Sequence, residues 1–376
     1  GNAMPRTVIT GVCGTVGSAL AARLMERDQD MEVLGLDNNE AGLFHMERRL
    51  GPTGRARFAL CDIRDAAALA EGLNGADTVF HCAAFKHVWL CERSPFEAVQ
   101  TNIHGVQNLI QAARAAGVGR VIFTSSDKAV NPTNVMGTSK LMGEKLMTAA
   151  SAHGAKGGAR ADGDGPVFAS TRFGNVLGSS GSVVPVFRRQ IAAGGPVTLT
   201  DPGMTRFVMG IPQAVDLIID SAELARGGEI FITKMPVARI QDLASVMIEA
   251  LAPACGHDPA SIEVTVTGAM PGEKMYEELM NQEETRRAVE LTDYFAVLPA
   301  FRGLHGEEDA TYPGTVSATV DDPYNSALQQ PLGSDALRGL LQAYGLLDPA
   351  PGEDDEPAGR YWPGDWPGNR SERGAR

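Results

Sequence analysis

The chain has 376 residues, of which 43% are hydrophobic, which is enough to bury a large core and excludes a globally disordered protein. Its formal net charge of −13 argues against a nucleic-acid partner, which would require a basic face. The sequence shows neither an apolar run of about 18 residues nor a basic-then-apolar export signal, so we expect a cytoplasmic protein without membrane contact.

The first half of the chain alternates short apolar β-branched runs with longer helical patterns. This alternation is typical of βαβ units and a parallel sheet. The expected strands are Thr7–Thr10, Glu32–Asp37, Arg57–Leu60, Thr78–Ala84, Arg120–Ser126 and Val167–Thr171. The expected helices in this half are Ser18–Glu26, Val106–Ala116 and Val135–Ala149.

After about residue 180 the pattern becomes less regular. Helices Ala214–Leu224 and Ile240–Leu251 alternate with short strands, Glu229–Ile232 and Glu263–Thr267. The five cysteines contain no C-x-x-C pair, so we expect reduced, mostly buried thiols and no metal site. The segment 348–376 is rich in Pro, Gly and charge, and is expected to be an extended or poorly ordered tail.

The first strand runs into a turn with the spacing G-x-x-G-x-x-G, formed by Gly11, Gly14 and Gly17. These glycines allow a tight turn, close approach of the backbone to a pyrophosphate, and close helix–strand packing. The helix that follows begins near Thr15 and Val16 and presents N–H groups to the phosphates. An ordinary glycine-rich loop is the alternative interpretation, but the position between a first strand and a helix favours a dinucleotide site.

The second strand ends in Asp37, 20 residues after Gly17. A carboxylate at that place accepts hydrogen bonds from both adenosine ribose hydroxyls and repels a 2′-phosphate, which favours NAD over NADP. Helix capping by Asp37 within Asp37-Asn38-Asn39 is the alternative. Further cofactor contacts are expected after the second, third and fourth strands, from Asn38, Asp62, Ile63, Ala83 and Ala84.

These signals predict an α/β fold, a Rossmann-type doubly wound parallel sheet with a smaller C-terminal substrate-binding region. We expect residues 4–180 to form mainly the NAD-binding domain. Residues 181–347 are expected to form mainly the substrate-binding region, interleaved with late strands of the main sheet.

The segment from Ser125 to Lys140 carries the candidate chemistry. A strand ends in hydroxyl residues, and Asp127 and Lys128 then place a carboxylate beside an amine. A turn follows, and then a helix on which Met136 and Lys140 are four residues apart and share a face. A solvated salt bridge is the alternative interpretation of the Asp127–Lys128 pair.

Here the chain resembles the extended short-chain dehydrogenases/reductases, and within them the UDP-N-acetylglucosamine 4,6-dehydratases that invert C5, a polysaccharide biosynthesis family. The likeness spans about residues 6 to 300 as ordered blocks. The blocks are Ala83-Ala84-Phe85-Lys86-His87-Val88, Thr101-Asn102-Ile103-His104-Gly105, Ser126 to Asn134, Arg172 to Gly178, Gly181 to Pro185, Met204 to Phe207 and Pro271-Gly272-Glu273-Lys274.

The resemblance implies oxidation at C4, elimination of water across C5–C6, and return of the hydride to C6. It implies that Asp127 protonates the leaving C6 hydroxyl, that Lys128 abstracts the C5 proton, that Ser126 holds the 4-hydroxyl and that Lys140 bonds the nicotinamide ribose. For Lys128 to act as a base, its pKa has to fall toward neutrality. The resemblance also places Lys86, Asn102, Lys140 and Phe173 at the cofactor, and Lys86, His87, Asn175, Ser182, Val183, Arg206 and Glu273 at a nucleotide sugar.

The chain departs from the superfamily's pattern at one position, where some dehydratases of the family also carry methionine, and from the family's usual pattern at two. The superfamily's catalytic tyrosine is replaced by Met136, whose thioether cannot accept the C4 hydroxyl proton. We expect Asp127, or a water held by it, to take that proton. Met270 and Ser180 stand where the family usually has arginine, which puts the exact nucleotide sugar in doubt.

Two other classes of function stay open. One is a nucleotide-sugar C4 or C5 epimerase, or a 5,6-dehydratase. The other is a non-catalytic dinucleotide-binding regulatory or scaffold protein, for which the missing tyrosine is the only support. Family analogy also leads us to expect a homo-oligomer.

Overall fold

The structure is a computed structural model that describes residues 4–153, 165–179, 182–269, 273–300 and 312–348. The segment 154–164, which is rich in Gly, Ala and charge, lies outside the described residues. So do Ser180 and Met270, and the expected tail after residue 348.

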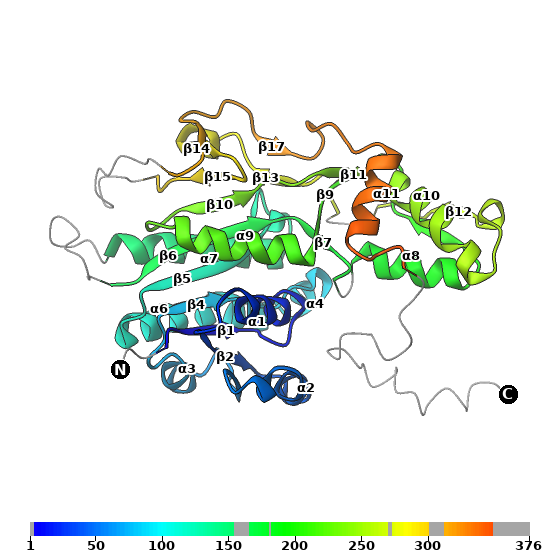
Figure 1. The fold of residues 1–376 in the computed structure, drawn as a ribbon. Helices are drawn as coiled ribbons and strands as arrows, with labels where there is room; N and C mark the ends of the chain where they lie inside the picture. Colours follow the sequence, from blue (N-terminus) through cyan, green and yellow to red (C-terminus); the bar gives the residue numbers. More distant parts are fainter. Residues whose placement is uncertain (1–3, 154–164, 180–181, 270–272, 301–311, 349–376) are drawn as a thin grey trace.

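One large sheet forms the centre of the molecule (Figure 1). Its strands lie in the spatial order β16 (Thr315–Ser317), β14 (Ala288–Leu291), β15 (Tyr294–Val297), β10 (Ile230–Thr233), β6 (Val167–Phe173), β5 (Arg120–Ser126), β4 (Thr78–His81), β1 (Arg6–Thr10), β2 (Glu32–Asp37) and β3 (Ala56–Leu60). The strands from β3 to β10 pair in parallel, and β15, β14 and β16 add an antiparallel edge. The central parallel strands β1, β4, β5 and β6 are buried almost throughout because helices cover both faces of the sheet, whereas β3, at the edge, is largely exposed.

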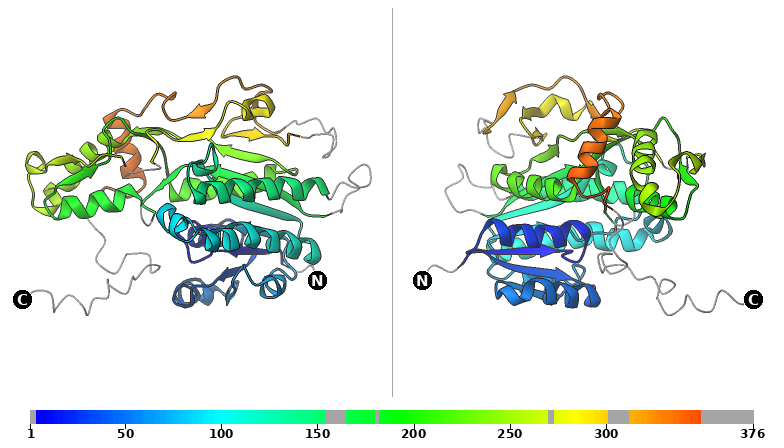
Figure 2. Two further views of the ribbon diagram at one scale, coloured as in Figure 1. Left: turned by 180° about the vertical axis from the view of Figure 1, so that it is seen from behind. Right: turned by 45° about the vertical axis from the view of Figure 1, so that its right-hand side comes forward.

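Helices cover both faces of this sheet, and each face has its own core (Figure 2). One core includes residues of α1 (Thr15–Arg27), α2 (Glu40–Leu50) and α9 (Ile211–Leu224). The other includes residues of α3 (Ala66–Gly72), α6 (Gly105–Ala116) and α7 (Val135–His153). This arrangement confirms the predicted doubly wound α/β fold.

The strand order reverses at β1, which pairs with β2 on one side and with β4 on the other. In such folds the crevice outside the carboxyl ends of the strands at this point is the usual ligand site. Strand β4 ends at His81, three residues before the predicted end, because Cys82, Ala83 and Ala84 leave the sheet and line that crevice. Two short helices, α4 (Val88–Arg93) and α5 (Pro95–Val99), then connect β4 to α6.

A smaller region lies beyond the carboxyl ends of the parallel strands, at the right of Figure 1. Its own apolar core includes Phe187, Leu243 and Leu337. The helices of this region are α8 (Val183–Ala192), α10 (Ile240–Leu251) and α11 (Ser334–Ala343). Its strands pair as β11 (Val237–Arg239), β9 (Thr205–Gly210) and β7 (Asn175–Leu177), and as β12 (Val264–Val266) with β8 (Val197–Leu199). A further pair, β13 (Glu278–Met280) with β17 (Tyr324–Asn325), packs against β10, β14 and β15 of the main sheet.

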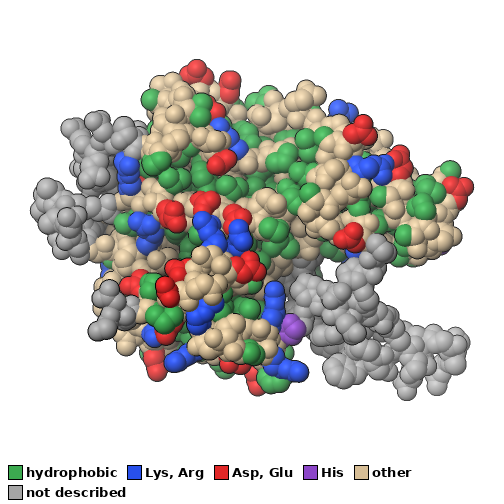
Figure 3. All heavy atoms as spheres, in the orientation of Figure 1, with side chains coloured by type: hydrophobic (Ala, Val, Ile, Leu, Met, Phe, Trp, Pro, Cys, Tyr) green, Lys and Arg blue, Asp and Glu red, His purple; other side chains and the backbone are tan. Residues whose placement is uncertain are grey.

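Over the described residues, none of the helices is both long enough and apolar enough to cross a membrane. Figure 3 shows basic and acidic side chains interspersed over the face in view, without a continuous basic surface there. That face therefore offers no electrostatic footprint for a nucleic acid.

Candidate active site

An elongated cleft of about 460 Å³ opens at the carboxyl ends of β1, β2, β4 and β5. It extends from the glycine-rich turn to the end of β5 and on to β7. Fourteen of the fifteen residues predicted at the cofactor line it: Gly11, Gly14, Thr15, Val16, Gly17, Asp37, Asn38, Asp62, Ile63, Ala83, Ala84, Lys86, Lys140 and Phe173.

The glycine-rich turn depends on close backbone contacts. Gly11 has a φ of +69°, in the left-handed region that favours glycine. A side chain on Gly17 would place its Cβ only 2.2 Å from the carbonyl oxygen of Gly11. The first turn of α1 can therefore lie directly against the turn, with its N–H groups at the cleft.

The acidic residues after β2 and β3 are held in place by neighbours. The carboxylate of Asp37 accepts the backbone N–H groups of Cys13 at 2.9 Å and Asn39 at 3.0 Å, which fixes the turn against β2. A carboxylate has about four lone-pair sites, so the ribose hydroxyls can still be accepted. The Asp62 carboxylate is paired with Arg64 at 2.7 Å, whose hydrogen bond holds the pKa of Asp62 below its ordinary value.

Asn102 is the one predicted cofactor residue that lies behind the cleft wall. Its side-chain oxygen accepts the N–H of Phe85 at 2.8 Å, and its amide donates to the Phe85 carbonyl and to the Ser139 hydroxyl, both at 2.9 Å. Its side chain is 2% exposed. Asn102 therefore fixes the Phe85–Lys86 wall to α7, while the cleft surface itself is formed by the wall residues.

The segment of candidate chemistry, Ser125 to Lys140, begins where β5 ends, and all five of its predicted catalytic residues line the cleft: Ser126, Asp127, Lys128, Met136 and Lys140. The hydroxyl of Ser126 donates to Asp127 Oδ1 at 2.8 Å, and the ammonium of Lys128 lies 3.4 Å from the same oxygen. The Asp127 side chain is 9% exposed and that of Lys128 is 34% exposed. The pair is thus an ion pair at the cleft floor.

The pKa of Lys128 does not meet the condition for a base, which is a fall toward neutrality. The carboxylate of Asp127 favours the charged ammonium and raises the pKa of Lys128 above its ordinary value, although burial acts in the opposite direction. Lys128 therefore holds its proton as long as Asp127 is negative.

Helix α7 brings Met136 and Lys140 to the same cleft, as the four-residue spacing predicts. The Lys140 ammonium donates to the Thr124 carbonyl at 3.0 Å and lies 4.7 Å from the centre of the Phe123 ring. Burial lowers the pKa of Lys140 to about 8. Met136 is 3% exposed and packs with Cys91 and Ala98, four residues before Lys140 on the same helix.

Sequence reasoning missed Glu277, a buried carboxyl next to this segment. Its Oε2 accepts the N–H of Phe207 at 2.9 Å, and its Oε1 is 2.5 Å from the side-chain amide of Asn175, which lines the cleft. Burial and the charge of Asp127 raise the pKa of Glu277 to about 8. The only sequence signal is its position three residues after the Pro271–Lys274 block, whose Glu273 was selected instead.

Five of the residues predicted to bind the nucleotide sugar lie outside the cleft lining, and their roles stay predictions. The Arg206 guanidinium donates to the backbone oxygens of Thr205 and Lys274, both at 2.8 Å. Glu273 is exposed on the segment before β13. The residues outside the lining are His87, Ser182, Val183, Arg206 and Glu273, whereas Lys86 and Asn175 line the cleft.

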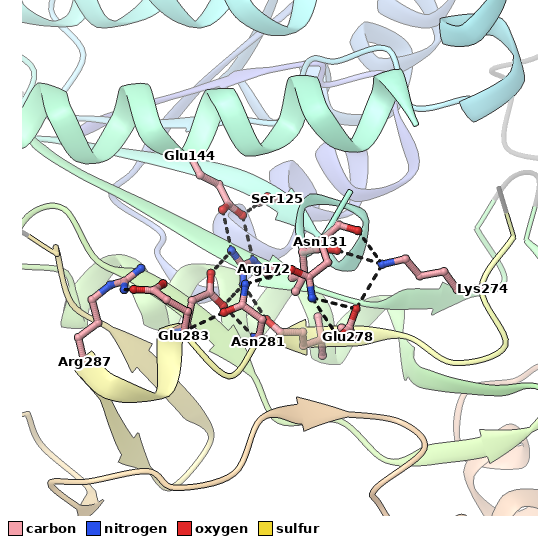
Figure 4. A network of polar contacts seen from close by, with 12 residues as sticks. Ser125, Asn131, Glu144, Arg172, Lys274, Glu278, Asn281, Glu283 and Arg287 are labelled. Atoms are coloured by element: carbon pink, nitrogen blue, oxygen red, sulfur yellow. Dashed lines mark hydrogen bonds and ion pairs between the residues drawn. The ribbon is translucent and has the colours of Figure 1, made fainter. Parts of the chain in front are cut away.

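A buried charge network, also missed from the sequence, connects α7 through β6 to the turn before β14 (Figure 4). The Arg172 side chain on β6 is fully buried and bonds Glu144 of α7 at 2.7 and 3.0 Å. It also bonds Glu284, in the turn before β14, at 2.9 and 3.1 Å. Ser125 donates to Glu144 at 2.5 Å, so the network reaches the residue next to Ser126.

A second set of contacts holds the loop that follows Lys128 (Figure 4). The Lys274 ammonium donates to the carbonyls of Val130 and Asn131 at 3.1 and 3.0 Å and pairs with Glu278 at 3.3 Å. Asn131 has a φ of +44° and donates its amide to the same Glu278. Lys274, in the segment before β13, and Glu278, at the start of β13, therefore fix the loop that directly follows Asp127 and Lys128.

No group of three or more His, Cys, Asp and Glu residues suited to a metal ion occurs among the residues that the structure describes.

A family model described as polysaccharide biosynthesis protein matches residues 7–299. A protein of Methanocaldococcus jannaschii named as an uncharacterized membrane protein is 46% identical over 292 residues, which cover 78% of this chain and 85% of that protein. An inverting UDP-N-acetylglucosamine 4,6-dehydratase of Campylobacter jejuni is 35% identical, with 80% and 85% covered. A UDP-glucose 4-epimerase of Rickettsia felis is 34% identical, with 89% and 94% covered.

Among solved structures, Pen from Bacillus thuringiensis is similar with a TM-score of 0.79 and 36% identity, covering 90% of this chain and 98% of that one. A dTDP-glucose 4,6-dehydratase of Streptomyces venezuelae, solved with NAD bound, is similar with a TM-score of 0.63 at 22% identity, covering 90% and 97%. This second likeness supports the fold.

Proposed function

The chain belongs to the polysaccharide biosynthesis protein family, and from this premise we propose that it is a UDP-N-acetylglucosamine 4,6-dehydratase that inverts C5 and uses bound NAD. The observation that carries the proposal is the Asp127–Lys128 ion pair at the floor of the cleft. Elimination of water across C5–C6 requires an acid for the C6 hydroxyl and a base for C5, and this pair supplies one of each.

The residues of the cleft fit an NAD molecule. The glycine-rich turn and the first turn of α1 offer backbone N–H groups to a pyrophosphate. The carboxylate of Asp37 stands where it accepts the ribose hydroxyls and repels a 2′-phosphate. Bound NAD supplies a hydride acceptor for the hydrogen at C4, and the same hydride returns to C6 at the end. Lys140 would orient the nicotinamide ribose from α7.

The first role of the protein in the reaction is to remove the C4 hydroxyl proton. Met136 cannot accept it, so in this proposal Asp127 does, while Ser126 holds the hydroxyl. Oxidation at C4 then acidifies the C5 proton, because the new carbonyl stabilises the carbanion that forms when this proton leaves.

Neutralising Asp127 also prepares Lys128 to act as a base. The charge of Asp127 is the main cause of the raised pKa of Lys128, whereas burial lowers that pKa. Once Asp127 has accepted the C4 proton, its charge no longer raises the pKa of Lys128, whereas burial still lowers this pKa. Lys128 can then release its proton to water. Lys128 then takes the C5 proton, and Asp127 passes the C4 proton to the leaving C6 hydroxyl. The proton from C4 leaves in the water molecule. The C5 proton stays on Lys128, and a proton from solvent is added to C5 on the opposite face, which replaces the one that Lys128 released to water.

A nucleotide-sugar epimerase is the second candidate, and the similarity to UDP-glucose 4-epimerases favours it. A C4 epimerase, however, needs neither an acid at C6 nor a base at C5. In such an enzyme the Asp127–Lys128 pair would have no acid–base role at these two carbons. The pair therefore favours the dehydratase.

The test is the mass of the product after incubation with UDP-N-acetylglucosamine. The proposal predicts loss of one water, and predicts that Asp127→Asn and Lys128→Ala each abolish that loss while NAD binding survives. An epimerase would give a product of unchanged mass. A protein that binds NAD and leaves the sugar unaltered would be a non-catalytic dinucleotide-binding protein, with a regulatory or scaffold role.

A further inference from the structure

The carboxyl of Glu277 lies beside the reactive pair and has no role in the mechanism above. Its side chain is 7% exposed, and it precedes β13 directly. Three charged groups face it: Asp127 and Lys128 from the turn after β5, and Arg206 from β9. Of these, Arg206 forms an ion pair with Glu277, with 3.6 Å between Nε and Oε1.

The other groups packed around Glu277 are either uncharged or paired with each other. The hydroxyl of Ser326 accepts the backbone N–H of Glu277 at 2.9 Å. On the segment that carries Glu277, Lys274 and Glu278 are paired with each other at 3.3 Å. The ionisation of Glu277 is therefore governed by burial and by the three charged groups named above.

The side chains of Glu277 and Asn175 are in direct hydrogen-bond contact, with Oε1 of the buried carboxyl next to the terminal amide of Asn175. An amide can offer its oxygen in place of its nitrogen after a half-turn about its last bond. A neutral Glu277 would then donate its O–H to Asn175, and the NH₂ group of Asn175 would turn toward the cleft.

The charge of Glu277 also affects the pKa of Lys128, and so whether this lysine can act as a base. A negative Glu277 raises the pKa of Lys128, as Asp127 does. If Glu277 were negative during the reaction, Lys128 would keep its proton even after Asp127 had become neutral. The mechanism above therefore requires the second carboxyl to be uncharged.

We propose that Glu277 is a positioning residue that works in its protonated form, directing the donor end of Asn175 into the cleft and leaving Lys128 free to lose its proton. The inference rests on the proposed function for its kinetic consequence, but not for the protonation state itself. It predicts that elimination slows when Glu277 ionises.

The experiment compares Glu277→Gln with the wild type, because glutamine imitates a neutral carboxylic acid but not a carboxylate. The matched control is Glu290→Gln, which removes a carboxylate paired with Lys234 at 2.8 Å on β14, at the far edge of the sheet. The measurement is a single turnover with UDP-N-acetylglucosamine, in which reduced cofactor forms during C4 oxidation and decays after elimination. The decay rate is recorded between pH 7 and pH 9.

With a pKa of about 8, the protonated fraction of Glu277 falls roughly tenfold between pH 7 and pH 9. The decay rate of the wild type and of Glu290→Gln should fall by about the same factor. Glu277→Gln should stay within about threefold of the wild type at pH 7 and lose the alkaline decrease. If the decay rate of Glu277→Gln still falls between pH 7 and pH 9, the proposal is overturned. It is also overturned if the folded variant has a decay rate more than about tenfold below that of the wild type at pH 7.

A second measurement needs no substrate. The difference infrared spectrum between pH 7 and pH 9 should contain the band of a buried carboxylic acid in the wild type and in Glu290→Gln, and lack it in Glu277→Gln. If the glutamine variant does not fold, Glu277→Asp replaces it and should keep the band while losing elimination rate, because its shorter side chain withdraws from Asn175. A wild type without the band overturns this inference alone. A wild type that shows the band but removes no water from the sugar overturns the proposed function and its kinetic consequence.

Discussion

Replacing Arg172 by methionine should destabilise the protein strongly, since it removes the only cation of the buried network. Arg172 is 0% exposed, and it neutralises Glu144, which is 0% exposed, and Glu284, which is 6% exposed. It also donates to the Leu279 carbonyl at 2.7 Å. Removing one partner of a buried ion pair typically costs about 3–5 kcal/mol. Because Arg172→Met leaves two buried carboxylates instead of one, we expect the upper part of that range at neutral pH.

The loss should shrink as the pH falls, and the sign follows from Glu284. In the wild type, burial alone would raise the pKa of Glu284, but Arg172 outweighs burial and holds this pKa below its ordinary value. Glu284 therefore contributes stability above its unfolded pKa, and this is lost as the pH falls through its folded pKa. Without Arg172, burial raises the pKa of Glu284. The variant therefore regains part of its unfolding free energy when that carboxyl takes a proton. The two unfolding free energies should converge toward pH 5.

Urea unfolding followed by far-UV circular dichroism at pH 7 and pH 5 measures this difference. The matched control is Arg338→Met, which removes an exposed pair with Glu249, in which Arg338 is 34% and Glu249 62% exposed. Such pairs contribute about 0–1 kcal/mol, so the control should change little at either pH. If Arg172→Met costs no more than the control, or costs the same at both pH values, the network does not hold the fold as described.

Three further predictions concern the cofactor and the chemistry. Gly17→Ala should abolish NAD binding in isothermal calorimetry while the protein stays folded, because its Cβ would lie 2.2 Å from a backbone oxygen of the turn; unimpaired binding would refute the role of that turn. Asp37→Ser should narrow the preference for NAD over NADP, and a wild type that binds NADP more tightly would contradict the assignment. Met136→Ala should retain C4 oxidation in a single turnover, whereas Asp127→Asn should lose about 10²–10⁴ in rate; the opposite order would show that Asp127 is not the C4 proton acceptor.

The main sheet could be predicted from the sequence because local patterns determine it. Strands β2 (Glu32–Asp37) and β5 (Arg120–Ser126) have the predicted bounds, since strands buried on both faces are short apolar runs that turn residues end sharply. The carboxyl ends of parallel strands meet at one edge of a sheet. For that reason Asp37 and the residues after β5 could be placed in one cleft before the structure was known.

The smaller region could be predicted only in outline, because its pairings join distant segments. Strand β7 has three residues and pairs with β9, which begins about thirty positions later. The burial of Glu277 likewise depends on Asn175 and Phe207, both far from it in sequence. The raised pKa of Lys128 depends on the direction in which its neighbour's carboxylate points, and residue types alone do not determine that direction.

The most direct test of the central claim follows two labels through one reaction. UDP-N-acetylglucosamine carrying deuterium at C4 is converted in ordinary water, and unlabelled substrate is converted in deuterated water. The account predicts a product lighter by one water, with the C4 deuterium recovered at C6 in the first reaction and solvent deuterium at C5 in the second. Lys128→Ala should abolish both outcomes. A product that keeps its oxygen at C6 and regains its label at C4 would identify an epimerase and contradict the account.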